Sequence, residues 1–239
     1  MYIPATLLSY NNYKSNLRLD VKTHMCGRYT IEEDENIVEM HKILSVAKSN
    51  ITQTNKNQYR QMKTGEIFPT DYVPVIVPHK NGRIDAVVMR WGFEHPSNHA
   101  RVINARFEGI RERPMFRGAV TNRRCIIPAN AFFEWKTHPQ SGFKEKFKIS
   151  PERSQMLYFG GVYNTTADKD TGEKVSEFVI ITKQAQGIFA SIHSRMPMVI
   201  QKRDMLIWLS CPENEIDEFY YAPAPEFTFR SMDGIGARV

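Results

Sequence analysis

Cys26 directly follows a methionine in the stretch MCGR, residues 25–28, and this position widens its chemistry. Methionine aminopeptidases remove an initiator methionine when a small residue follows it. If Met25 begins the chain, Cys26 then carries a free thiol and a free α-amine. If Met1 begins it, Cys26 offers only the thiol. The alternative role of a lone cysteine is that of a small buried hydrophobic residue.

Glu134 stands among aromatic side chains in AFFEW, residues 131–135. A carboxylate held between aromatic rings loses hydration, so its pKa is expected to rise. Such a carboxyl group suits a general acid or base near neutral pH. Alternatively, Glu134 lies at the surface and its aliphatic stem packs on Trp135. The sequence gives these two interpretations equal weight.

The stretch INARFE, residues 103–108, alternates polar and apolar side chains. A strand would place Asn104, Arg106 and Glu108 on one face, where they could act together. A solvated edge strand gives the same pattern and is the simpler explanation for this stretch alone.

His193 is the strongest catalytic candidate among the seven histidines, because its predicted strand is otherwise apolar and Arg195 would share its face. His95 and His99 have a spacing typical of metal ligands. However, Pro96 interrupts the helix that this spacing needs, and no third ligand is near in sequence, so a loop is predicted there.

Composition fits one large domain or two small ones: 239 residues, 41% hydrophobic and 24% charged. No apolar run approaches the roughly 20 residues that span a bilayer, so no membrane association is expected. A net charge of +6 permits a polyanionic partner without requiring one. Cys26, Cys125 and Cys211 form no CxxC pair, which argues against a disulfide framework and for a reducing compartment.

The elements that must position these residues are mostly strands. Residues 1–24 show no clean period and predict a flexible extension without a targeting signature. Helical spacing predicts helices over 32–47 and 203–209, and the polar stretch 48–66 predicts a loop. Short β-branched and aromatic runs predict strands over 25–30, 72–78, 81–93, 123–135, 147–150, 156–164, 176–183 and 195–200. The expected fold is α+β, mainly antiparallel sheet with a few flanking helices.

Taken in order, several stretches resemble the SOS-response-associated peptidase (SRAP) family. They are MCGRYT, RWGF, INARFE, RRCIIPANAFFEW, FGGVY and IHSRMPMVI. The resemblance runs from Met25 to about Ile200 and more faintly to the end. It implies a single SRAP-like domain over 25–239, with antiparallel sheets in a barrel-like arrangement.

The resemblance also implies a chemistry, which is covalent capture of abasic sites in single-stranded DNA by an N-terminal cysteine. An α-amine has a pKa of about 7.7–8.0, so part of it is neutral and can form a Schiff base with the sugar aldehyde. The thiol then closes a thiazolidine ring. In this scheme Cys26 is the nucleophile and Asn104 orients amine and sugar. Glu134 shuttles protons during ring opening, and His193 assists Schiff-base formation and reversal.

The resemblance further assigns a DNA-binding surface. Arg28, Arg106 and Arg195 match arginines that hold phosphates, for which guanidinium groups are well suited. Pro69, Trp91 and Trp135 are expected to pack against exposed bases, with core packing as the alternative for the tryptophans. The expected partner is single-stranded DNA with abasic sites, and no cofactor and no metal are expected. The protein is expected to be a monomer inside the cell, in the cytoplasm or nucleoid, or in the nucleus of a eukaryote.

Two other functions stay open from the sequence. One is a cysteine-dependent peptidase with His193 or Glu134 as base. The other is a single-strand binder that forms no adduct. The SRAP resemblance also suggests release of the residues ahead of Cys26, if Met1 is used. An upstream start assigned in error, with Met25 as the initiator, is the simpler expectation.

Overall fold

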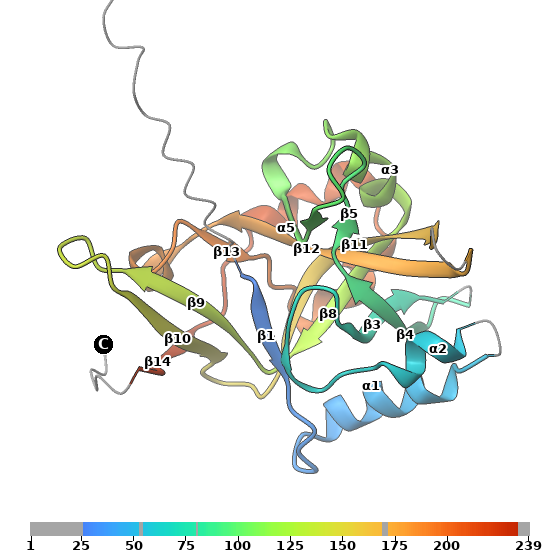
Figure 1. Ribbon diagram of the computed structural model, residues 1–239, viewed down its shortest axis with the longest axis horizontal. Coiled ribbons are helices and arrows are strands. Elements are labelled where there is room, and N and C mark those ends of the chain that lie inside the picture. The colour runs from blue at the N-terminus through green and yellow to red at the C-terminus, as the bar shows by residue number, and fades with distance from the viewer. Residues whose placement is uncertain (1–25, 53–54, 80, 169–171, 234–239) are drawn as a thin grey trace, which may run out of the picture.

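The computed structural model describes residues 26–52, 55–79, 81–168 and 172–233. Within them, a closed β-barrel stands beside an open five-stranded sheet, and helices flank the barrel (Figure 1). The predicted α+β class and its barrel-like arrangement are thereby confirmed. The predicted extension 1–24 lies outside the described residues, and a domain boundary at residue 25 stays a prediction.

The barrel closes because each of its strands pairs with two others. The order is β11, β8, β3, β4, β12, and β12 pairs back to β11. Of the five pairings that close the barrel, only that of β4 with β12 is parallel. Two short strands, β7 and β13, pair with β12 as well. The bounds are β3 (Tyr72–Pro78), β4 (Ile84–Trp91), β7 (Asn104–Arg106), β8 (Arg124–Ala129), β11 (Leu157–Ala167), β12 (Lys174–Gln184) and β13 (Arg195–Pro197).

The open sheet is antiparallel, in the order β14, β10, β9, β1, β2. Its inner face is apolar, because Tyr29, Phe132 and Ile149 lie opposite one another and are fully buried. One residue along, the register aligns polar and aromatic side chains on the outer face. The bounds are β1 (Arg28–Ile31), β2 (Gly65–Ile67), β9 (Ala131–Thr137), β10 (Lys144–Pro151) and β14 (Phe227–Ser231).

The predicted strand 123–135 is two strands that belong to different sheets. Asn130 separates β8 from β9, and its side chain makes two bonds that a continuous strand would not need. Its Oδ1 accepts from the backbone N–H of Glu32 at 2.7 Å, and its Nδ2 donates to the carbonyl of Gln155 at 2.9 Å. This buried asparagine therefore fixes the corner where the chain passes from the barrel to the open sheet.

The helices differ most from the sequence prediction. The first begins at Val38 rather than at Glu32, because Asp34 accepts from the backbone N–H of Asn36 and holds a local turn. The predicted loop 48–66 contains α2 and β2. The bounds are α1 (Val38–Ser49), α2 (Lys56–Arg60), α3 (Pro114–Asn122), α4 (Met205–Ser210) and α5 (Asp217–Tyr221). The helices α3 and α5 were not predicted, whereas the predicted helix 203–209 is confirmed as α4 after a 3₁₀ turn, Lys202–Asp204.

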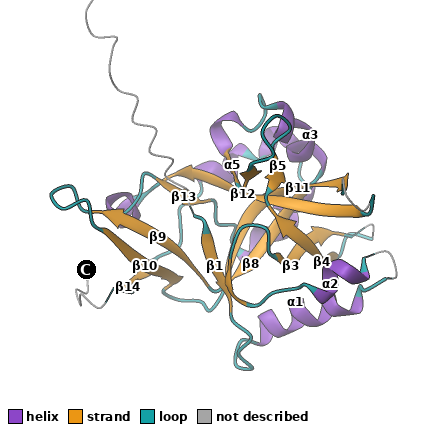
Figure 2. Ribbon diagram, viewed as in Figure 1, coloured by secondary structure: helices purple, strands orange, loops and turns teal. Residues whose placement is uncertain are grey.

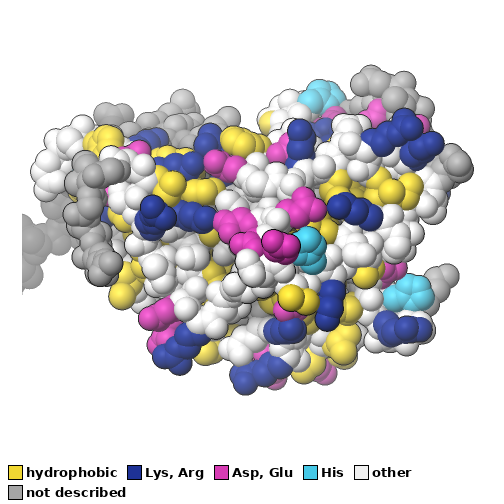
Figure 3. All heavy atoms as spheres, turned by 90° about the horizontal axis from the view of Figure 1, so that it is seen from below, with side chains coloured by type: hydrophobic (Ala, Val, Ile, Leu, Met, Phe, Trp, Pro, Cys, Tyr) yellow, Lys and Arg dark blue, Asp and Glu magenta, His cyan; other side chains and the backbone are white. Residues whose placement is uncertain are grey.

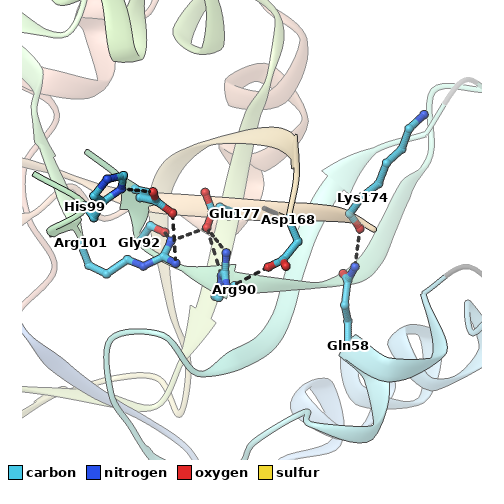
Figure 4. Close-up of polar contacts among 9 residues, drawn as sticks. Gln58, Arg90, Gly92, His99, Arg101, Asp168, Lys174 and Glu177 are labelled. Carbon is cyan, nitrogen blue, oxygen red and sulfur yellow. Dashed lines mark hydrogen bonds and ion pairs between the residues drawn. The ribbon is translucent and has the colours of Figure 1, made fainter. Parts of the chain in front are cut away.

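A buried ion cluster ties the barrel at one of its short backbone pairings. β4 and β12 share only two residue pairs, Glu177 with Arg90 and Phe178 with Trp91. Glu177 accepts from Arg90 Nη2 at 2.7 Å and from Arg101 Nη1 at 2.5 Å (Figure 4). The carboxylate is 3% exposed, so two guanidinium groups neutralise a charge that would otherwise be costly to bury.

The helices α1, α2, α3 and α5 lie at the barrel side of the molecule (Figure 2). Seen from below, basic, acidic and apolar side chains are interspersed on the surface (Figure 3). Among the described residues, no helix is long and apolar enough to cross a membrane.

Candidate functional site

Cys26 and Glu134 meet at the edge between β1 and β9. The two strands pair antiparallel, and Glu134 lies on the same inner face as Phe132. The backbone N–H of Cys26 donates to Oε1 of Glu134 at 2.5 Å. Cys26 is fully buried and Glu134 is 2% exposed. The Cys26 nitrogen, which would be an amine if Cys26 began the chain, is thus hydrogen-bonded to Glu134, the candidate proton donor and acceptor.

Burial sets the protonation of this pair. It raises the pKa of Glu134 to about 8, although backbone N–H groups of Cys26 and Trp135 act in the opposite direction. Burial, and then the negative charge of Glu134, also raise the pKa of the Cys26 thiol well above its ordinary value. At neutral pH the carboxyl group is therefore largely protonated and the thiol is neutral. The surface alternative for Glu134 is wrong, because its side chain points into the core.

The backbone at Cys26 is strained. Its φ is +40°, in the left-handed region that residues with a side chain rarely adopt. Such a conformation costs on the order of 1–3 kcal/mol and is found most often at functional sites.

Asn104 and Arg106 come from β7, which runs parallel to β12. The residue before them, Ile103, lies against the segment that follows Cys26: a Cβ at Gly27 would be 4.0 Å from Cδ1 of Ile103. Arg106 is exposed, and Asn104 is half-buried. The strand β7 thus brings the INARFE motif beside the start of β1.

The strand β7 is shorter than the motif. Glu108 lies in a 3₁₀ helix, η1 (Phe107–Gly109), so the prediction that it shares a strand face with Asn104 and Arg106 is wrong. The Phe107 side chain of this 3₁₀ helix is buried. Glu108 reaches Arg195 instead, and both of its carboxylate oxygens accept from that guanidinium group.

His193 also lies outside a strand, because β13 begins only at Arg195. Its Nδ1 is 3.1 Å from both the backbone nitrogen and the carbonyl oxygen of Arg195, which fixes the ring in a turn. The preceding 3₁₀ helix packs on β9, since Phe189 is 5.7 Å from the ring of Phe132. His193 therefore comes from the loop between β12 and β13, and this loop contacts the strand that carries Glu134 through Phe189.

Arg28 lies in a mixed aromatic and charged cluster on the outer face of the open sheet. Its guanidinium group is 4.6 Å from the ring centre of Phe68 and 5.4 Å from that of Trp135. Glu66 accepts from Arg28 at 3.2 Å and from Lys146 at 3.0 Å. Sequence analysis missed Phe68, Glu66 and Lys146. The lysine alternation in KEKFK, residues 144–148, was the available signal for Lys146.

The two tryptophans of the predicted DNA surface differ. Trp91 is fully buried, stacks against Phe178 and donates its indole N–H to the carbonyl of Ile103 at 3.0 Å. It is a core residue, which corrects its expected contact with bases. Trp135 and Pro69 are half-buried and remain at the surface.

The histidines with metal-like spacing lie in a turn, as predicted. His95 contacts the hydroxyl of Ser97, and the ring of His99 bonds to Glu94. Among the residues that the structure describes, no three His, Cys, Asp or Glu side chains are grouped to hold a metal ion.

The fold is found in solved structures of proteins from two bacteria. A chain from Bordetella bronchiseptica aligns with a TM-score of 0.68 and 19% identity, over 86% of this chain and 99% of that one. A chain from Bacteroides thetaiotaomicron aligns with a TM-score of 0.67 and 20% identity, over 87% and 93%.

The family model described as SOS response associated peptidase (SRAP) matches residues 25–233. The chain belongs to the SRAP family, which confirms the resemblance seen in the sequence. It is 29% identical to abasic site processing protein YoqW of Bacillus subtilis over 204 residues, 80% of this chain and 82% of that protein. It is 23% identical to abasic site processing protein HMCES of Gallus gallus over 180 residues, 61% of this chain and 53% of that protein.

Proposed function

We propose that this protein captures abasic sites in single-stranded DNA through a covalent bond to Cys26, and so shields the lesion. The observation that carries the proposal is the 2.5 Å contact between the nitrogen of Cys26 and Oε1 of Glu134 in a buried site. The names of similar proteins, which are abasic site processing proteins, support the choice of substrate.

The chemistry requires that Cys26 begin the chain. Its amine then condenses with the sugar aldehyde, releases water and leaves an imine. The thiol adds to the imine carbon, its proton passes to nitrogen, and a thiazolidine ring results. Glu134 would exchange a proton with that nitrogen, from which its Oε1 is 2.5 Å away. In the longer chain, where the nitrogen is an amide, burial raises the pKa of Glu134 to about 8, which suits proton transfer near neutral pH.

Two features favour amine chemistry over thiolate chemistry. A cysteine peptidase needs a thiolate, whereas burial and Glu134 raise the pKa of the Cys26 thiol. In addition, the strained φ of Cys26 exists only while a residue precedes it. A chain that begins at Cys26 has no such torsion, so removal of the preceding residues relieves the strain.

Release of the residues ahead of Cys26 is a second activity that we propose for the same site. Water would add to the carbonyl carbon of the preceding peptide bond, and the bond to the Cys26 nitrogen would break. The protonated carboxyl group of Glu134, 2.5 Å from that nitrogen, would supply the proton that the leaving amine needs.

Around this centre, Arg28, Arg106 and Arg195 are proposed to contact phosphates, and Trp135 and Pro69 to contact bases. Asn104 is proposed to orient the amine and His193 to assist Schiff-base chemistry. The aromatic surroundings of Arg28 support a site for an unpaired nucleotide, because bases stack on aromatic rings regardless of sequence. The monomeric state remains a prediction.

Intact-mass spectrometry of two forms tests the proposal. One form begins at Cys26, and the other verifiably retains residues 1–25. Each is mixed with a single-stranded oligonucleotide that contains one abasic site. We expect a heat-stable adduct from the first form and none from the second, whose nitrogen is locked in an amide. A stable adduct from the longer form contradicts thiazolidine chemistry, and no adduct from either contradicts covalent capture.

A further inference from the structure

Arg106 and Arg195 both lie beside β12, opposite Thr182 and Gln184, but they differ in ion pairing. Arg106 is exposed. The side chain of Arg195 is only 14% exposed, and its guanidinium group is paired with Glu108. Within the described part of the chain Arg106 has no ion-pair partner, so a phosphate that approaches this edge meets one cation without a counter-ion there and one, Arg195, that is paired with Glu108.

Arg195 is held on two sides. Glu108 accepts from Nη1 and, at 2.7 Å, from Nη2. Nη2 also donates to the carbonyl of Thr182 at 2.7 Å. Of five guanidinium N–H groups, these contacts use three, which fixes the plane and direction of the group.

Glu108 is in turn held by α5. The hydroxyl of Tyr220 donates to its Oε1 at 3.1 Å, and the Tyr220 ring stacks on Phe107 with centres 5.0 Å apart. Burial opposes ionisation of Glu108, yet hydrogen bonds from Arg195 and Tyr220 bring its pKa down to about 2. The carboxylate is therefore charged at every physiological pH.

The end of α5 is itself anchored to the barrel. Lys183, 3% exposed on β12, donates to the carbonyls of Tyr220 at 2.9 Å and Ala222 at 2.6 Å. These contacts fix the position of Tyr220, and Tyr220 in turn fixes Glu108. The arrangement therefore favours a Glu108 carboxylate that stays paired with Arg195 over one that moves away from it.

We propose that Glu108 is a positioning residue that, braced by Tyr220, presents Arg195 to a DNA phosphate as a rigid donor whose positive charge is already paired. Arg106 supplies the salt-dependent attraction to the phosphates, and Arg195 supplies hydrogen-bond donors in a fixed direction. The inference rests on the proposed function, because it takes Arg195 to be a phosphate ligand. It predicts that Glu108, though an anion beside the DNA path, strengthens binding.

The physical reason is preorganisation. A free arginine side chain loses rotamer freedom when it binds, and this loss weakens binding. Glu108 and Thr182 impose that order before DNA arrives. The paired charge releases few counter-ions, so Arg195 contributes little to the dependence of affinity on salt.

The test uses the form that begins at Cys26 and four variants: Glu108→Gln, Tyr220→Phe, Arg106→Ala and Glu226→Gln. The last is a matched control, because Glu226 pairs with Arg153 at 2.8 Å on exposed surface and its loss changes net charge equally. Affinity and its salt slope are measured by fluorescence anisotropy with an oligonucleotide carrying a tetrahydrofuran analogue, which has no aldehyde. Adduct formation with a true abasic site is followed against DNA concentration.

We expect Glu108→Gln to weaken affinity about fivefold relative to Glu226→Gln, without flattening the salt slope. The half-saturating DNA concentration for adduct formation should rise equally, and the maximal rate should stay. Tyr220→Phe should weaken affinity about twofold relative to wild type, again without a change in the maximal rate. Arg106→Ala should instead reduce the salt slope by about 0.7, the value for one single-strand phosphate contact.

Two results overturn the inference. If Glu108→Gln binds like Glu226→Gln and Tyr220→Phe binds like wild type, Glu108 is only structural, and a lower melting temperature would be its sole effect. If Glu108→Gln binds more tightly than Glu226→Gln, the carboxylate blocks Arg195. Should Glu108→Gln fail to fold, Tyr220→Phe decides. A wild-type protein without any adduct contradicts the proposed function, while the anisotropy measurements still decide the role of Glu108.

Discussion

Two buried glutamates show how differently one fold can treat the same side chain. Glu134 is 2% exposed and Glu177 is 3% exposed. Glu134 accepts a hydrogen bond from the backbone nitrogen of Cys26. Burial raises its pKa, and two backbone N–H groups lower it by less. Glu177 lies between the guanidinium groups of Arg90 and Arg101 (Figure 4). The first carboxyl group is poised to move a proton, and the second holds strands together.

Strand register accounts for the difference. Glu177 lies opposite Arg90 on β4, whereas Glu134 lies opposite Phe147 on β10. Glu177 therefore forms ion pairs that join strands, whereas burial among apolar groups raises the pKa of Glu134. A perturbed pKa beside a nucleophile candidate is the stronger sign of function.

The largest effect should come from Glu134→Gln in the form that begins at Cys26. Glutamine keeps the shape but cannot exchange a proton, so adduct formation should slow by about 10²–10⁴-fold. Binding of the tetrahydrofuran oligonucleotide should be unchanged, which serves as the control. An adduct rate equal to wild type from pH 5 to 8 would remove Glu134 from the mechanism.

Glu177→Ala should mainly affect stability. It leaves Arg90 and Arg101 with only their more distant carboxylates, Asp168 at 4.0 Å and Glu94 at 3.9 Å. The free energy of unfolding should fall by about 3 kcal/mol. Urea unfolding followed by circular dichroism measures this change. Glu226→Ala, in an exposed ion pair, should change the same quantity by less than about 0.5 kcal/mol. A loss at Glu177 as small as that would make the ion cluster irrelevant to barrel closure.

The raised pKa of Glu134 predicts a pH dependence of stability in the full chain. Folded Glu134 keeps its proton up to about pH 8, whereas an unfolded glutamate ionises near pH 4.3. Unfolding therefore releases a proton between these values, and the contribution of Glu134 to stability declines by about 1.4 kcal/mol per pH unit as pH rises. Glu134→Gln should remove this decline in urea titrations at pH 5, 6.5 and 8.

Glu108→Gln is the matched control for that titration. The folded pKa of Glu108, about 2, lies below the unfolded value, so its contribution is complete above pH 5 and is lost only as pH falls toward 2. Its offset from wild type should be constant between pH 5 and 8. Parallel curves for wild type and Glu134→Gln would contradict the raised pKa of Glu134.

The smallest effect is expected on DNA affinity, where substitution of Trp135 and of Trp91 should give different results. Trp135→Leu should weaken binding of single-stranded DNA about fivefold, through the loss of about 1 kcal/mol of base stacking, with stability nearly unchanged. Trp91→Leu should instead lower the melting temperature and leave affinity alone, since Trp91 is fully buried. Anisotropy and thermal unfolding of both variants check this contrast. If Trp91→Leu weakened DNA binding and Trp135→Leu did not, Trp135 would not belong to the DNA-binding surface.

The sequence by itself determined the fold class, most strands and the motifs that define the family. Short runs of β-branched and aromatic residues located β3, β11 and β12, because those strands carry their hydrophobic pattern locally. It did not locate α3 or the break at Asn130. That break depends on bonds to Glu32 and Gln155, which lie 98 and 25 residues away in sequence.

Only the tertiary structure decided what each site residue does. The letters AFFEW allowed a surface glutamate or a buried one, and the pairing of β9 with β1 selected the buried one on the Cys26 nitrogen. Arg106 and Arg195 look equivalent in sequence, yet Glu108 neutralises only Arg195. Charge and pKa depend on neighbours in space, and long-range strand pairing brings those neighbours together, so local patterns cannot encode them.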